Sequence, residues 1–116
     1  MKDFLLVYRT DENTMKDLPR RSPEQMQANT KRWMDWIGGL AARDKLVDRG
    51  NRLVPSGKVV KSNKIIADGP YTEIKECIVG YSIVKANSLE EAVELTESCP
   101  VFSMGGNVEV REISVL

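Results

Sequence analysis

The sequence predicts an α+β subunit of the ferredoxin-like type, with the element order β-α-β-β-α-β, an antiparallel sheet and an extra β-hairpin. Two observations predict it. Two segments repeat apolar residues at helical spacing behind a serine that can cap a helix. The segments around them are short, rich in β-branched and aromatic residues, and separated by turn-forming residues. The 116 residues are predicted to form a single domain spanning residues 1–116.

One strand and one long helix are expected in the first part of the chain. The strand covers residues 4–9, which are mostly apolar. Ser22, Pro23 and Gln25 predict the helix start, because serine and the glutamine three residues later form a capping box and a first-turn proline lacks an N–H that the helix leaves unused. The helix is expected to end near Arg43. Its core-facing stripe is expected to hold Met26, Thr30, Trp33, Ile37 and Leu40, with Met34, Trp36 and Ala41 at the edges.

Short strands are expected in the middle of the chain. Residues 46–54 predict a strand that breaks near Gly50. Residues 58–61 and 64–67 predict a hairpin around Ser62-Asn63, because small polar residues favour tight turns between strands.

The last part of the chain predicts a strand, a helix and a strand. Residues 77–86 form the first strand, and Ser88 with Glu91 predicts a second capping box at the start of the helix. Pro100 is expected to end this helix, and residues 107–113 to form the last strand. The inner face of the helix is expected to hold Leu89, Ala92, Val93, Thr96 and Cys99.

The strand over residues 77–86 is apolar on both faces. With strict alternation, one face carries Cys77, Val79, Tyr81 and Ile83, and the other carries Ile78, Gly80, Ser82 and Val84. Two helices on one side of a sheet cover only one of its faces. We therefore expect a homodimer in which the second face is covered by the same face of another copy.

The charge composition narrows the classes of partner. The formal net charge is zero, which argues against direct contact with nucleic acid, because such contact requires a basic face. No apolar run reaches the ~20 residues of a membrane-spanning helix, so no membrane partner is expected. We expect a cytoplasmic protein in which Cys77 and Cys99 are reduced and buried as small hydrophobic side chains.

The absence of histidine limits the chemistry. The chain contains none, which excludes Ser-His-Asp and Cys-His nucleophilic systems and any histidine base. Two cysteines cannot form a four-thiolate zinc site. No metal or cofactor is expected, and any catalysis would use carboxylates, Lys, Arg, Tyr or Cys.

The stretch Asp68-Gly69-Pro70, followed by Tyr71, has two interpretations. The three residues together predict a tight turn, since aspartate accepts from nearby backbone N–H groups, glycine adopts unusual dihedral angles and proline fixes the exit. Alternatively, Asp68 is a base or hydrogen-bond acceptor at the mouth of a cavity and Tyr71 is its wall or proton donor.

Arg9, Arg111 and Trp36 are the other candidate ligand-binding residues. Both arginines belong to predicted strands, and if they face the space between two subunits they suit an anionic ligand such as a carboxylate. The alternative is an Arg–Glu pair at the rim of a dimer. Trp36 either lines a pocket or fills the core.

Several motifs in one order resemble those of the YCII-related family, in particular its DGPF branch. They are SPE, WMDWIGGLAARDKLVDRG, DGPYTEIKECIVGY, SLEEA and GGNVEVREI, and they cover nearly the whole chain. The resemblance implies a dimeric α/β barrel built from ferredoxin-like subunits. Tyr71 stands where the DGPF motif has phenylalanine. The histidine–aspartate pair associated with YCII-type enzymes cannot be carried over, because the chain has no histidine.

The leading hypothesis is a homodimeric YCII-related protein with a cavity for a small molecule, for which an anionic metabolite is the candidate ligand. Whether it is an enzyme stays open. One alternative is a lyase or isomerase of small acids that uses carboxylate acid–base chemistry, with Asp68 as base and Arg9 or Arg111 as anion clamp. A further alternative is an interaction module linked to transcription initiation, because some DGPF relatives are associated with sigma factors.

Overall fold

The computed structural model describes residues 1–11, 13–14, 21–62, 66–69 and 76–116, with residues 67–69 and 76 described by their backbone alone. In chain order its elements are β1 (Lys2–Asp11), α2 (Pro23–Ala42), β2 (Leu46–Asp48), β3 (Gly57–Val60), β4 (Ile66–Gly69), β5 (Glu76–Ala86), α3 (Leu89–Leu95), the 3₁₀-helix η3 (Pro100–Met104) and β6 (Asn107–Glu112).

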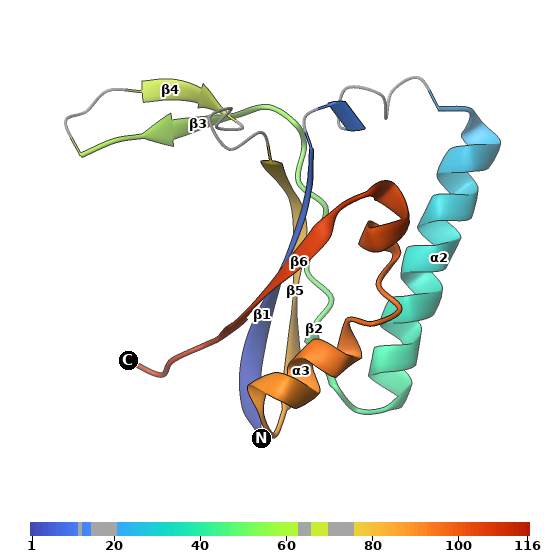
Figure 1. Cartoon of the computed structure of the whole chain (residues 1–116), viewed down its shortest axis with the longest axis vertical. Helices are drawn as coiled ribbons and strands as arrows, with labels where there is room; N and C mark the ends of the chain where they lie inside the picture. The colour runs from blue at the N-terminus through green and yellow to red at the C-terminus, as the bar shows by residue number, and fades with distance from the viewer. Residues whose placement is uncertain (12, 15–20, 63–65, 70–75) are drawn as a thin grey trace.

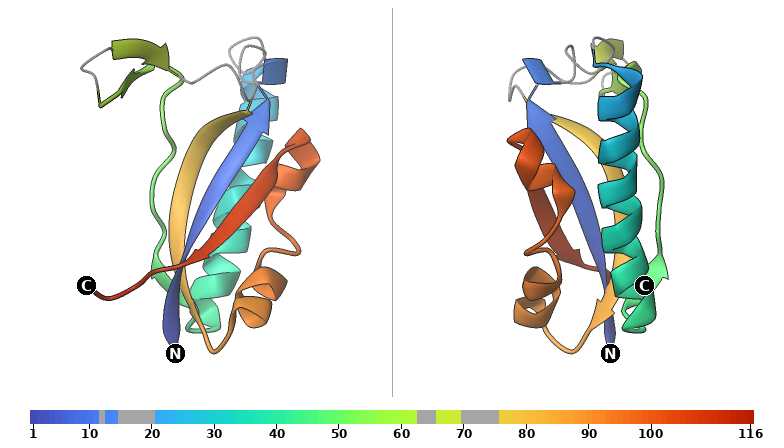
Figure 2. Two further views of the ribbon diagram at one scale, coloured as in Figure 1. Left: turned by 60° about the vertical axis from the view of Figure 1, so that its left-hand side comes forward. Right: turned by 90° about the vertical axis from the view of Figure 1, so that its right-hand side faces the viewer.

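The described strands form a four-stranded antiparallel sheet in the order β2-β5-β1-β6 and a separate two-stranded hairpin of β3 and β4. Helices α2 and α3 both cover the same face of the larger sheet (Figures 1 and 2). This order places the first and last strands of the subunit side by side, as in the ferredoxin-like arrangement. The predicted α+β fold and the extra hairpin are therefore confirmed.

The core lies between the sheet and the two helices. Strand β1 occupies the middle of the sheet and buries every second side chain, namely Phe4, Leu6, Tyr8 and Thr10. The remaining core residues come from α2, β5, α3 and the segment after α3: Leu40, Val84, Ala86, Ala92, Leu95, Cys99 and Val101. Burying one large apolar side chain contributes about 1.5–3 kcal/mol, so this small cluster supplies the main stabilisation of the subunit.

The predicted capping box at the start of α2 is confirmed. The Ser22 hydroxyl accepts a hydrogen bond from the Gln25 backbone N–H at 3.2 Å, and the Gln25 side chain accepts one from the Ser22 backbone N–H at 2.9 Å. Two N–H groups that the helix leaves without a partner are thereby satisfied.

The second capping box is only half formed. Ser88 accepts from the Glu91 backbone N–H at 3.1 Å, as predicted. The Glu91 carboxylate, however, accepts from Lys45 Nζ at 2.7 Å and from the Asn87 backbone N–H at 3.3 Å. The hydrogen bond from Lys45 is the main cause that lowers the pKa of Glu91. Glu91 therefore ties α3 to the loop after α2 rather than closing its own cap.

The predicted faces of β5 are wrong because the strand contains a β-bulge. Strand β1 pairs Tyr8 with Gly80 but Arg9 with Ile78, which leaves Val79 as an extra residue. One extra residue in a strand places each later side chain on the face opposite to the one that strict alternation predicts. The buried, helix-side residues of β5 are Cys77, Gly80, Ser82, Val84 and Ala86.

The predicted inner faces of both helices need correction. In α2, Thr30 is exposed and Met34 is 62% exposed, because the helix is turned so that Trp33 and Trp36 both pack edge-on against Tyr8. In α3, the corrections concern Leu89 and Val93, which are exposed, and Leu95, which is buried. This helix ends at Leu95, and Pro100 begins η3 instead of ending α3. Because α3 has only 7 residues, few of its side chains can reach the sheet.

The tight turn predicted at Asp68-Gly69-Pro70 is also wrong for its first two residues. Asp68 pairs with Lys58 and Gly69 with Gly57, so both continue strand β4. Backbone pairing with β3 holds both residues in extended conformation, so the chain does not turn at them. Pro70 lies outside the described residues.

The predicted break at Gly50 is confirmed, and it has a steric reason. Gly50 has a φ of 66°, and a Cβ atom there would overlap the carbonyl oxygen of Tyr81. This close approach lets the chain after β2 continue along β5, where Arg52 forms an isolated bridge with Gly80. Only glycine fits both the backbone angle and the space.

We predict that Gly50→Ala destabilises the subunit by about 2–5 kcal/mol, because backbone strain adds to the overlap with β5. Urea unfolding followed by circular dichroism measures the change. Gly38→Ala is the control, since nothing lies within 4 Å of the added atom in α2, and it is expected to gain up to about 1 kcal/mol. Equal stability of the two variants would contradict this account of Gly50.

Candidate functional site

The face of the larger sheet that carries no helix is here called the helix-free face. Its central and β6-side residues are Leu5, Val7 and Arg9 from β1, Ile78, Tyr81 and Ile83 from β5, and Asn107, Glu109 and Arg111 from β6, and the pair of Asp3 and Lys85 lies at one end. Leu5, Val7, Tyr81 and Ile83 are half-buried, and Ile78 is 52% exposed. The apolar residues lie on β1 and β5 in the middle of the sheet, and Arg9, Glu109 and Arg111 lie where β1 meets β6. The alternation of side chains along β1 and β6, together with the bulge at Val79 in β5, places them here, opposite the core.

Arg9 and Arg111 meet at Glu109 on this face. Arg9 Nη1 lies 3.5 Å from Glu109 Oε1, and Arg111 Nη1 lies 3.5 Å from Glu109 Oε2. The Arg9 Nε group also donates to the Asn107 side-chain oxygen at 2.9 Å. The structure therefore brings the two predicted arginines together, and it forms the Arg–Glu pairing that was the alternative to an anion site. Asn107 was missed, although it stands directly opposite Arg9 in the register.

In the described part of this cluster, the guanidinium groups of Arg9 and Arg111 flank the carboxylate of Glu109. The side chains of Arg9, Glu109 and Arg111 are 32%, 39% and 72% exposed. Ion pairs this exposed contribute only about 0–1 kcal/mol each, so they do little for the stability of the subunit. An anion that displaced or joined Glu109 would therefore disturb the fold very little.

The other acid–base candidates lie partly outside the described residues. Asp68 belongs to β4 by its backbone, but its side chain is not described, and Tyr71 falls outside the described ranges. Their predicted roles as base and proton donor stay predictions.

Trp36 lies on the opposite side of the sheet from the two arginines. The centroid of its ring lies 6.0 Å from the ring centroid of Tyr8 and 5.9 Å from that of Trp33. The ring centroids of Tyr8 and Trp33 lie 4.8 Å apart, and all three pairs are in edge-to-face contact. Such contacts add about 0.5–1.5 kcal/mol each to the area that the rings bury. Within one subunit, Trp36 and the arginines cannot bind the same small ligand, because the sheet separates them.

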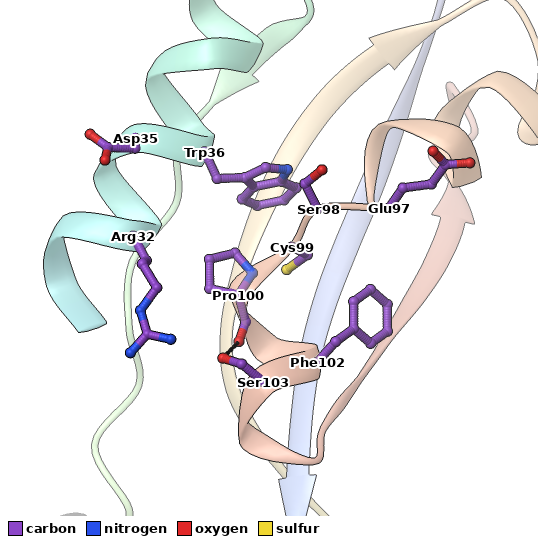
Figure 3. Close-up of a pocket in the computed structure, with 9 residues that line it drawn as sticks. All are labelled: Arg32, Asp35, Trp36, Glu97, Ser98, Cys99, Pro100, Phe102 and Ser103. Atoms are coloured by element: carbon purple, nitrogen blue, oxygen red, sulfur yellow. Dashed lines mark hydrogen bonds between the residues drawn. The ribbon is translucent and has the colours of Figure 1, made fainter. Parts of the chain in front are cut away.

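Trp36 also lines an open groove of about 590 Å³ between α2 and the segment around η3 (Figure 3). The α2 side supplies Arg32, Asp35 and Trp36, and the other side supplies Glu97, Ser98, Cys99, Pro100, Phe102 and Ser103. Arg32 is the one cation among these lining residues, against the two acids Asp35 and Glu97. Asp35 is held by Lys31 at 2.8 Å. The groove therefore offers a small anion less than the helix-free face does.

A chain of buried hydroxyl groups runs beneath the aromatic cluster. The Tyr8 hydroxyl donates to Ser82 Oγ at 2.8 Å, and Ser82 Oγ donates to the Arg49 carbonyl at 2.6 Å. Burial raises the pKa of Tyr8 well above its usual value, so the phenol stays protonated and acts as a donor. The sequence analysis missed these two hydrogen bonds, because it missed the bulge that turns Ser82 toward the helices. The signal was Gly80, since an isolated glycine inside a strand often marks a bulge.

Neither cysteine has the features of a nucleophile. Cys77 and Cys99 are both buried, as predicted. Burial raises the pKa of the Cys99 thiol to about 12, so very little reactive thiolate exists near neutral pH. Cys99 acts as a small apolar side chain at the base of the groove.

No metal site was found in the part of the chain that the structure describes, since no three acidic or thiol side chains come together there. A separate search of the described helices found none that is long and apolar enough to cross a membrane.

Comparison with known families gives one result. The family model of the YCII-related domain matches residues 2–116. The narrower assignment to the DGPF branch stays a prediction. A search of the curated proteins gave no match.

We predict that Ser82→Ala costs more stability than Tyr8→Phe. The first change leaves the buried Tyr8 hydroxyl without a partner and removes the hydrogen bond to the Arg49 carbonyl, at about 1–3 kcal/mol. The second change leaves Ser82 bonded to Arg49 and costs about 1 kcal/mol. Equilibrium unfolding in urea measures both. If Tyr8→Phe were the more damaging change, the hydroxyl chain would not be the main constraint at this site.

Proposed function

Because the chain belongs to the YCII-related family, we propose that it is a homodimer whose helix-free faces meet and bind a small anionic metabolite between them. One observation carries this proposal. On the sheet face without a helix, Arg9 and Arg111 both lie 3.5 Å from Glu109, beside half-buried apolar residues.

The dimer follows from the apolar half of this face. Leu5, Val7, Tyr81 and Ile83 are neither covered by α2 and α3 nor replaced by polar residues, as an antiparallel strand facing water would require. A large apolar patch at the surface of a subunit marks an interaction site. A second copy is the partner that needs no further assumption, because a twofold axis pairs the same patch on both subunits.

Further exposed apolar residues lie in the segment that follows β6. The chain after β6 departs on the side of the helix-free face (Figure 1). Ile113 is 40% exposed, and Val115 and Leu116 are almost fully so. A partner subunit on this side would remove part of this surface from water as well.

The anionic ligand follows from the charged half of the face. A twofold axis would bring the arginines of two subunits to one space, and covering the face lowers the local dielectric constant, which strengthens the attraction of a guanidinium group for an anion. Guanidinium groups match carboxylate and phosphate in geometry as well as in charge. Small carboxylates or phosphate esters are therefore the proposed ligand class.

Binding without chemistry is the proposed activity. The chain has no histidine, and the groups that the structure places at Arg9 and Arg111, namely Glu109 and Asn107, suit the binding of an anion beside the arginines. A cytoplasmic location is also proposed, since the thiols of Cys77 and Cys99 stay reduced there.

The dimer is tested by sedimentation equilibrium at micromolar concentration. The wild type is expected to be dimeric, and Val7→Asp is expected to weaken the dimer by about 100-fold or more, or ~2.7 kcal/mol, because an unpaired charge would be buried at the contact. Met34→Asp on the exposed side of α2 is the control and should dimerise as the wild type does. A monomeric wild type would refute the proposed assembly.

The anion is tested by thermal-shift measurements with small carboxylates, phosphate and phosphate esters. A ligand at about 100 times its Kd stabilises the protein by ~2.7 kcal/mol, and Arg111→Ala is expected to remove this response. Lys31→Ala is the charge-matched control, because Lys31 lies on α2 and pairs with Asp35. An equal response of both variants would place the ligand elsewhere or exclude it.

A further inference from the structure

The hairpin of β3 and β4 stands apart from the rest of the described structure. It forms a two-stranded sheet of its own, in which Gly57–Val60 pairs with Ile66–Gly69. In Figures 1 and 2 it extends beyond one end of the larger sheet, on the side away from α2 and α3. It thus overhangs the space in front of the helix-free face. We call these two strands the arm.

The arm presents an apolar pair to solvent. Val60 and Ile66 stand directly opposite each other in the register, so their side chains point to the same side of the arm. Val60 is 70% exposed and Ile66 is 63% exposed. Neither side chain is covered by its own subunit.

An arm of this kind is not expected to be stable by itself. A single two-stranded hairpin is only marginally stable in water, and needs a third strand or an apolar surface against which to pack. Directly opposed β-branched residues contribute to a sheet mainly when they pack on something. The described part of the subunit supplies no such surface to Val60 and Ile66, which stay 70% and 63% exposed.

We propose that the arm packs on a second copy of this chain through Val60 and Ile66 and closes one end of the space between the two sheets. The occupant is a second copy because the arm projects on the side of the helix-free face, where the proposed dimer places one. In a twofold dimer each subunit supplies one arm and receives one. This inference rests on the proposed homodimer and identifies the arm as a segment that contacts the partner.

The first test compares dimer affinities by sedimentation equilibrium. The double variant Val60→Asp with Ile66→Asp is expected to raise the dimer Kd by about tenfold or more, because two charges would be placed in an apolar contact. Met34→Asp, equally exposed but on α2, is expected to stay within about twofold of the wild type. A double variant with the affinity of the wild type would overturn the inference.

The second test does not depend on how the double variant folds. The photo-crosslinking change Val60→benzoylphenylalanine is expected to yield a covalent dimer under ultraviolet light, whereas Met34→benzoylphenylalanine is expected to yield monomer only. A dimeric wild type with no covalent dimer from position 60 would overturn the role of the arm and leave the proposed dimer intact. A monomeric wild type would overturn both.

Discussion

The strict alternation of side chains along β1 is the constraint on which the rest of the structure depends. This strand lies between β5 and β6, so it has no free edge, and each of its residues must face either the helices or the opposite side. Its inward side chains are the centre of the core, and its outward ones begin the helix-free face. One face of β1 therefore belongs to the core of the subunit, and its other face belongs to the candidate site.

The bulge at Val79 adapts β5 to this central strand. It shifts the pairing by one residue, so that Gly80 faces Tyr8 and Ser82 comes within reach of the Tyr8 hydroxyl. Small residues at these positions leave room for the chain around Gly50, which approaches β5 closely enough for the Arg49 carbonyl to accept from Ser82. A polar link is thereby buried in a small core without leaving its donors and acceptors unsatisfied.

The sheet also separates two kinds of surface. On the helix side, aromatic residues and a shallow groove with more acids than cations surround Trp36. On the other side, an apolar area borders the cluster of Arg9, Glu109 and Arg111. A function that needs a second subunit fits the latter better, because covering the face would both bury its apolar residues and strengthen the hold of its arginines on an anion.

The sequence by itself determined the kinds of the main elements, their order and the start of α2 at Ser22. These depend on local signals, namely capping residues and short periodicities, that act within a few residues. Only the tertiary structure decided the faces of β5, the rotation of α2 and the meeting of Arg9 with Arg111 at Glu109. A bulge depends on the strand beside it, a helix turns to fit the rings beneath it, and an ion pair depends on register, so each is a property of partners distant in the chain.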